Sequence, residues 1–241
     1  MVEFVTSFYV FLPLARFLYM LREIIALLRK EILLEWKQRY ALNGLLLYVI
    51  SMVTVVSLAF LTKTQNLLTP QVWNVMFWIM MLFVSINAVA KSFMAENEGL
   101  SYYLYGLAHP TAIILAKIIY NTFLLCLMGV IALFFSALLG KMQLGNVPFF
   151  LATIGAGSFA FASNLTLVSA IATKSENSTT LLAVLSFPLV VPILLILINL
   201  SLLAIQGKAL EQHLSNLGTV LGFGGILMYL STLLFPFIWR D

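Results

Sequence analysis

Charged side chains are scarce in this sequence. Asp, Glu, Lys and Arg make up 9% of its 241 residues, against roughly a quarter in ordinary soluble domains. Hydrophobic residues make up 62%, and the mean hydropathy is +1.06. Because these few charges cannot cover a water-facing surface, the excess apolar residues must face lipid. Soluble, secreted, disordered and nucleic-acid-binding classes are excluded, and the net charge of +4 is better interpreted as topology information.

Residues that carry redox, metal or nucleophilic chemistry are also scarce. The single cysteine, Cys126, excludes an intramolecular disulfide, a CxxC pair and a CxxCH haem-attachment motif. The only histidines, His109 and His213, are predicted on opposite sides of the membrane, so they cannot share a metal ion. HExxH, GxSxG and Walker A motifs are missing. The sequence therefore predicts no enzyme and no metal site, and it leaves any cofactor-binding residues unknown.

Long apolar runs are abundant, and a helix needs about 20 such residues to cross the hydrocarbon. Six runs meet that requirement: residues 42–62, 72–90, 112–139, 148–172, 181–204 and 217–239. We therefore predict an all-α polytopic membrane protein with a six-span domain over residues 42–241.

Basic residues set the predicted orientation. Nine of the 13 Lys and Arg fall on one side of the spans, namely Arg16, Arg22, Arg29, Lys30, Lys37, Arg39, Lys91, Lys174 and Arg240. Lys63, Lys141 and Lys208 fall on the other side. Lys117 lies within the third span and should extend to the headgroups, with a buried functional lysine as the alternative. The positive-inside rule then places both termini in the cytoplasm.

The residues before the first span divide into two segments. Residues 1–20 lack a basic n-region and are interrupted by Pro13, so we expect a peripheral segment rather than a signal peptide, with Met20 as an alternative start. Residues 21–41 place an apolar stripe opposite basic residues at helical spacing, which predicts an amphipathic helix in the membrane interface. Packing on a partner subunit is the alternative for this helix.

The loop between the second and third spans, KSFMAENEGLSYYLYGLAHP, has the pattern of a short amphipathic helix. Two acids precede leucine and tyrosine residues at helical spacing, and a glycine and a proline end the pattern. The predicted partner-docking residues are Glu96, Glu98, Gly99, Leu100, Tyr103, Leu104 and Leu107. An aromatic belt at the headgroups is the alternative use of the tyrosines.

Two further features lie inside spans. Pro188 and Pro192 each remove a backbone donor from the fifth span, which predicts a bend or break there and leaves a gating role open. Polar residues in the second and fourth spans are expected mainly to form interhelical hydrogen bonds, with a substrate site as the alternative. These residues are Asn87, Ser163, Asn164, Thr166 and Ser169.

The order of parts resembles the ABC-2 exporter permease plan and, more closely, the CcmB family of haem-exporter permeases in cytochrome c maturation. The matching stretches are ALLRKEILLEWKQRYALNGLLLY at residues 26–48, LAK at 115–117 and FPLVVPIL at 187–194. In the loop, this sequence keeps the acids, a glycine and the proline but has tyrosines where the family usually has leucines.

The resemblance implies a permease subunit in the bacterial inner membrane, present in two copies. ATP would be hydrolysed by a separate ABC ATPase, and haem would be a possible cargo rather than a covalently bound cofactor. Further implied partners are a haem-handling membrane subunit, a small helper subunit and, indirectly, a periplasmic haem chaperone. The loop helix of residues 96–107 would couple ATP hydrolysis to haem delivery or chaperone release. A permease for a glycolipid, polysaccharide or drug, or a non-transporting scaffold, is the alternative.

Overall fold

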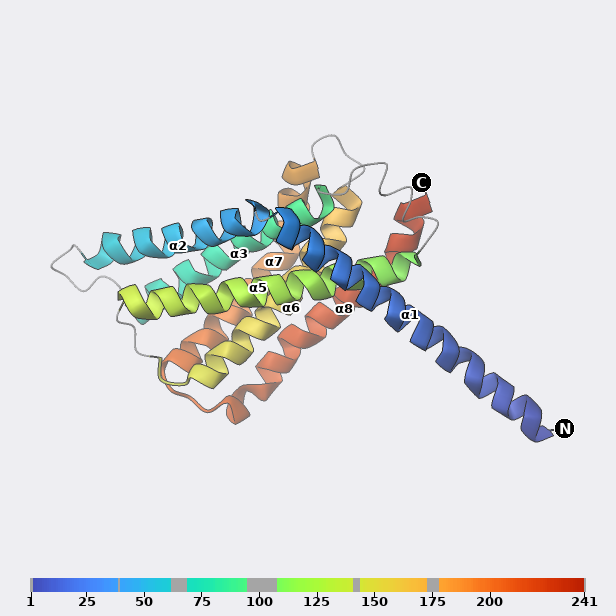
Figure 1. Cartoon of the computed structure of the whole chain (residues 1–241). Helices are drawn as coiled ribbons and strands as arrows, with labels where there is room; N and C mark the ends of the chain where they lie inside the picture. The colour runs from blue at the N-terminus through green and yellow to red at the C-terminus, as the bar shows by residue number, and fades with distance from the viewer. Residues whose placement is uncertain are drawn as a thin grey trace.

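The computed structural model describes residues 2–38, 40–61, 69–94, 108–140, 144–172 and 178–240, and within these ranges it contains helices and no strand (Figure 1). The helices are α1 (Val2–Gln38), α2 (Tyr40–Leu61), α3 (Pro70–Met94), α5 (Pro110–Gly140), α6 (Val147–Ala172), α7 (Ser178–Ile205), the short 3₁₀ helix η1 (Leu210–His213) and α8 (Leu214–Arg240). The all-α prediction is therefore confirmed. A single helix, α1, runs through both segments that the sequence divides at residue 20.

Within the described ranges, five segments are long and apolar enough to cross a membrane. They are α3, α5, α6, α7 and the stretch Leu210–Phe237 that contains α8. The part of α2 that qualifies as apolar, Asn43–Leu58, is shorter, so the count of six spans stays a prediction.

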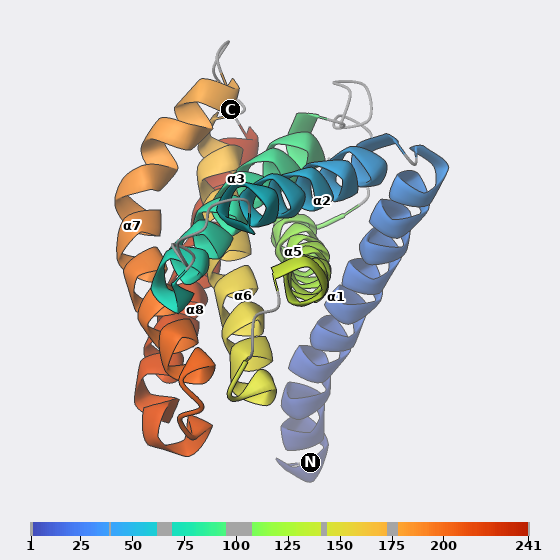
Figure 2. The ribbon, with the colours of Figure 1, turned by 90° about the vertical axis from the view of Figure 1, so that its left-hand side faces the viewer.

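The central helix of the bundle is α6, which packs against α5, α7 and α8 (Figure 2). Its small residues let neighbouring helices approach closely. A Cβ at Gly157 would lie 2.7 Å from the Trp78 ring of α3, and a Cβ at Gly224 of α8 would lie 3.2 Å from Ala160 Cα of α6. Trp78, Phe161 and Phe150 are all fully buried in the same core.

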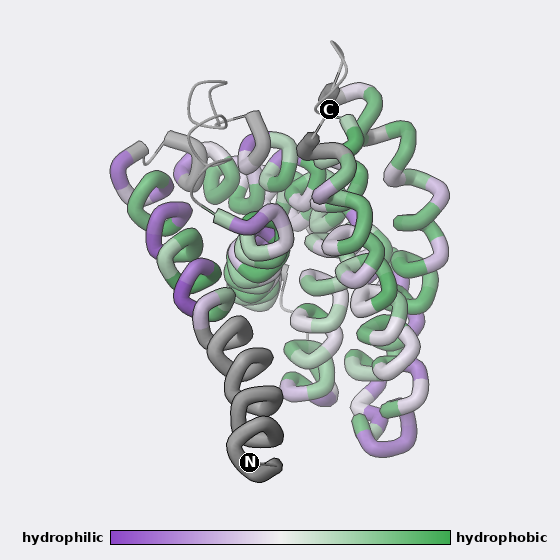
Figure 3. The backbone as a smooth tube through the Cα atoms, turned by 90° about the vertical axis from the view of Figure 1, so that its right-hand side faces the viewer, coloured by the Kyte–Doolittle hydropathy of each residue, from purple (hydrophilic) through white to green (hydrophobic). Residues whose placement is uncertain are grey.

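With 31 residues, α5 is about 46 Å long at 1.5 Å per residue. Its two termini therefore lie far apart. We call the end of the bundle where α3 finishes and α5 begins the first end, and the end where α5 finishes and α6 begins the second end. α1 packs against the half of α5 that begins at the first end. Figure 3 shows that hydrophilic residues gather along α1 and at the bundle ends.

Candidate coupling site between α3 and α5

A buried lysine joins α3 to α5 at the first end. Lys117 lies two turns into α5, and its side chain is only 2% exposed. Its ammonium Nζ donates a hydrogen bond to the carbonyl oxygen of Ser92 at 2.9 Å. The prediction that Lys117 extends to the headgroups is therefore wrong, because the side chain turns inward to the end of α3.

The position of Ser92 explains why this contact is favourable. The last four carbonyl groups of a helix have no partner within the helix, and the helix dipole makes that terminus partly negative. α3 ends at Met94, so Ser92 belongs to this group. Lys117 supplies both a donor and a positive charge there. A buried ammonium is costly without such partners, so the lysine favours this relative placement of the two helices.

A second set of contacts holds α1 against α5 at the same end. His109 Nδ1 lies 3.3 Å from the Glu23 carboxylate, and the Tyr120 hydroxyl donates to Glu35 at 3.1 Å. Between these two polar pairs, Ile24 and Leu27 are buried against the apolar start of α5. The part of α1 that follows residue 20 therefore packs on this chain's own bundle through one face.

The opposite face of α1 is exposed, with large apolar side chains beside basic ones. Trp36 is 72% exposed, and Leu21, Ile25 and Ile32 are also exposed. Arg22, Arg29 and Lys37 share this exposure. The carboxylates of Glu23 and Glu31 are mostly buried, at 11% and 14% exposure. Apolar and basic groups without exposed acids suit an anionic membrane surface.

The predicted docking residues Glu96, Glu98, Gly99, Leu100, Tyr103, Leu104 and Leu107 lie outside the described residues. Their role stays a prediction. The described chain stops at Met94 and resumes at Ala108, and Lys117 bridges the two helices that flank this segment. Sequence reasoning did not predict this bridge. The available signal was the position of Lys117 inside an apolar run, between Ala116 and Ile118 and away from the end of the predicted span.

Interior polar residues form one clear network between α3 and α7. Trp78 Nε1 donates to Ser201 Oγ at 2.7 Å, and Asn74 Nδ2 donates to the Ile198 carbonyl at 2.6 Å. Ser201 Oγ also lies 2.7 Å from Asn74 Oδ1. These residues fix α7 to α3, and the pattern is structural rather than catalytic, because it contains no base or acid.

Four of the five predicted polar residues of α3 and α6 divide into three cases, and the fifth, Ser169, is buried. Thr166 accepts a hydrogen bond from Asn121 of α5 at 3.3 Å, as expected for an interhelical pair. Asn87 is exposed and donates to Phe83 of its own helix at 2.9 Å, so no interhelical bond forms there. Among the described residues, the buried side chains of Ser163 and Asn164 have no hydrogen-bond partner.

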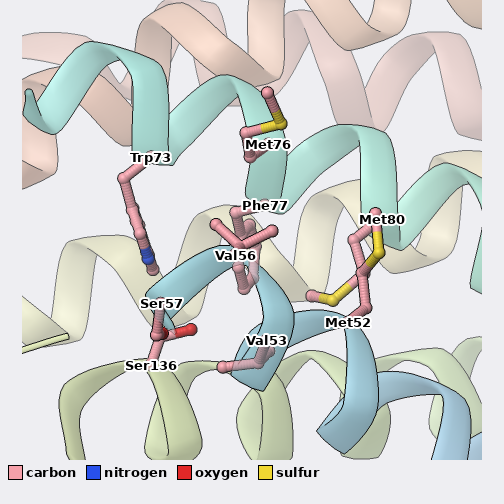
Figure 4. Close-up of a pocket in the computed structure, with 9 residues that line it drawn as sticks. All are labelled: Met52, Val53, Val56, Ser57, Trp73, Met76, Phe77, Met80 and Ser136. Atoms are coloured by element: carbon pink, nitrogen blue, oxygen red, sulfur yellow. The ribbon is translucent and has the colours of Figure 1, made fainter. Parts of the chain in front are cut away.

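A small pocket between α2, α3 and α5 brings three methionines together (Figure 4). Met52, Met76 and Met80 line it, with Ser57 and Ser136 at one side. Its volume of about 20 Å³ accommodates roughly one water molecule. The pocket is therefore far too small for haem, despite its soft thioether sulfur atoms.

The two prolines of α7 lie on its outer face. Pro188 and Pro192 are exposed, while Val190 and Ile193 are buried toward the bundle. α7 remains one helix through both prolines and bows along its length (Figure 2). The bend is therefore present and the break is not, and the gating role stays a prediction.

These features define a multi-pass helical membrane protein in which the described interior polar contacts join neighbouring helices. A family model described as CcmB protein matches residues 22–237, which is nearly the whole chain. The chain therefore belongs to the CcmB family. It is a membrane permease component of the ABC system that exports haem for cytochrome c maturation, and that system includes an ATPase partner. No curated protein and no solved structure matches the chain.

Proposed function

We propose that this chain couples ATP hydrolysis by its partner ATPase to haem delivery or to release of the haem-loaded chaperone. The observation that carries this proposal is the hydrogen bond from Lys117 to Ser92, which joins the two helices flanking residues 95–107. A protein seated on that segment acts on α3 and α5 together, because the buried bridge makes them move as a pair.

The energetic requirement is differential binding. A nucleotide changes a conformation only when its complex favours one arrangement over the other. The ATP-bound ATPase would hold the segment of residues 96–107 in one position, and α3 and α5 would follow. Haem is the cargo of the complex in this proposal, and the chain itself holds no covalent cofactor.

We propose an orientation with both termini in the cytoplasm of a bacterial inner membrane. The excess of basic residues on that side and the exposed basic face of α1 support it. In this orientation the first end of the bundle faces the ATPase. The proposed partners are a haem-handling membrane subunit, a small helper and a periplasmic chaperone, with two copies of this chain.

Leu104→Asp tests the docking assignment directly. A charge on the apolar face of the predicted docking helix should abolish ATPase association, while membrane insertion stays intact. Co-purification of the ATPase from gently solubilised membranes is the measurement, with Leu138→Asp, an exposed position near the second end, as the matched control. Retained association together with normal maturation of c-type cytochromes would contradict the assignment.

The same preparation distinguishes the alternative cargoes. Mass spectrometry should identify an ABC ATPase and a haem-binding membrane protein among the co-eluting subunits. An ATPase without any haem partner would favour another cargo. An intact preparation without an ATPase would favour a scaffold.

A further inference from the structure

An open groove lies between the start of α2 and the last turns of α3, near the first end of the bundle. Its volume is about 460 Å³. It is lined by Asn43, Gly44, Leu45, Leu47, Tyr48, Asn87 and Lys91. None of these residues belongs to the α3–α5 bridge or to the contacts between α1 and α5.

The lining follows from two matched helical rows. Asn43 and Leu47 are four residues apart on α2, and Asn87 and Lys91 are four apart on α3, so each pair lies on one face of its helix. Gly44 leaves room between the rows. A Cβ at Gly44 would lie 3.6 Å from Lys91 Nζ, so the ammonium extends over the first turns of α2.

The polar side of the groove presents hydrogen-bond donors. Lys91 is exposed, and no described carboxylate forms an ion pair with it. Asn87 uses one amide N–H on the Phe83 carbonyl, which leaves its second N–H for a ligand. Tyr48 adds a phenol. An ammonium with an amide and a phenol is a set that recognises an anionic oxygen group.

The other side of the groove is apolar and open to the surroundings. Leu47 is 68% exposed on the outer face of α2, whereas Leu45 is buried at the base. A ligand that satisfies both sides carries an anionic head and a hydrocarbon chain. We propose that this groove binds an anionic phospholipid, with its phosphodiester at Lys91 and an acyl chain along Leu47.

The location supports a lipid in preference to a protein partner. The groove lies where two helices of a membrane protein reach the headgroup level, and basic pockets between such helices bind anionic lipids. A protein would have to supply a carboxylate and an apolar side chain on one narrow element. A phospholipid supplies an anionic phosphodiester and an apolar acyl chain in one molecule, and it is already present in the membrane at high concentration.

The test uses the complete complex, delipidated and then returned to vesicles of phosphatidylglycerol or of phosphatidylcholine. Native mass spectrometry counts the lipids retained per complex. We expect the wild type to retain phosphatidylglycerol about fivefold more strongly than Lys91→Gln does, from the usual contribution of one basic residue. Lys208→Gln, which changes an exposed cation near the second end, is the matched control and should resemble the wild type.

A second measurement locates the lipid. Phosphatidylglycerol with a photoactivatable acyl chain should label peptides of α2 and α3, and Gly44→Leu should reduce that labelling by filling the groove. Equal retention of both lipids, unchanged retention in Lys91→Gln, or labelling only on other helices would overturn the proposal. A cross-link from Lys91 to a neighbouring subunit in the delipidated complex would overturn it too, because a protein would then occupy the groove.

Discussion

The two ends of the bundle are held by different kinds of contact. At the second end, the backbone of residues 145–146 pairs with the end of α7. Gly145 N donates to the Ile205 carbonyl at 3.1 Å, and Asn146 N donates to the Ala204 carbonyl at 2.9 Å. The Asn146 side chain also accepts from Phe149 N at 3.1 Å, which caps the start of α6.

At the first end, side chains make the joints that the structure describes. Lys117 reaches the Ser92 carbonyl, Tyr120 reaches Glu35, and His109 pairs with Glu23. Backbone pairing fixes two segments at one separation, whereas the side-chain contacts of α1 with α5 let the paired helices α3 and α5 shift against α1. The comparison indicates that the second end is the more fixed part of the molecule, and under the coupling proposed above the first end is where the ATPase would act.

The largest effect should come from breaking the fixed end. A Cβ at Gly145 would lie 2.5 Å from Gly207 Cα, and Gly207 itself has a φ of +77° that favours glycine. Gly145→Ala should therefore separate the two loops and lower the free energy of unfolding by about 3 kcal/mol. Thermal unfolding in detergent is the measurement.

Gly155→Ala is the matched control for this prediction. A Cβ there meets nothing within 4 Å, and the position lies inside α6. Replacing a helical glycine by alanine should then raise stability by up to about 1 kcal/mol. Equal destabilisation by the two substitutions would show that the close approach at Gly145 is not what fixes the second end.

An intermediate effect is expected from Lys117→Met, which keeps the length of the side chain and removes its donor. The Ser92 carbonyl loses a charged partner, so maturation of c-type cytochromes should fall about tenfold, equivalent to roughly 1.4 kcal/mol of lost coupling. The ATPase should still co-purify and hydrolyse ATP. If Lys117→Met abolished both ATPase co-purification and cytochrome maturation, Lys117 would have a purely structural role. Lys117→Arg, which keeps a charged donor, should restore part of the maturation.

The smallest effect is expected where α1 meets α5. Tyr120→Phe removes a hydrogen bond to a carboxylate and should loosen α1 by about 1 kcal/mol, seen as faster amide exchange in α1. His109→Gln should change exchange less, because the histidine side chain is 60% exposed and exposed pairs contribute little. If His109→Gln accelerated amide exchange in α1 more than Tyr120→Phe did, the exposed His109–Glu23 pair rather than the buried Tyr120 hydroxyl would hold α1 in place.

The sequence predicts the bounds of the long apolar helices well because length and apolar composition decide them, whereas the boundary predicted at residue 20 lies inside α1. The predicted span of residues 148–172 compares with Val147–Ala172 for α6. The directions of polar side chains depend on which helix lies alongside, and no periodicity contains that information. Lys117 illustrates this limit, since its partner is the end of α3, 25 residues earlier. Asn87 is the opposite case, a polar residue expected between helices that instead lines an outer groove.

The inward position of the α1 carboxylates has a consequence for the order of assembly. Glu23 meets His109, and Glu35 meets Tyr120, across separations of 86 and 85 residues. While the ribosome is still synthesising the chain between them, α1 carries its acids beside its arginines and lysines. Only after α5 has been made and inserted can those acids turn away from the surface. The exposed face of α1 therefore becomes predominantly cationic only late in biosynthesis, once Glu23 and Glu35 have their partners on His109 and Tyr120.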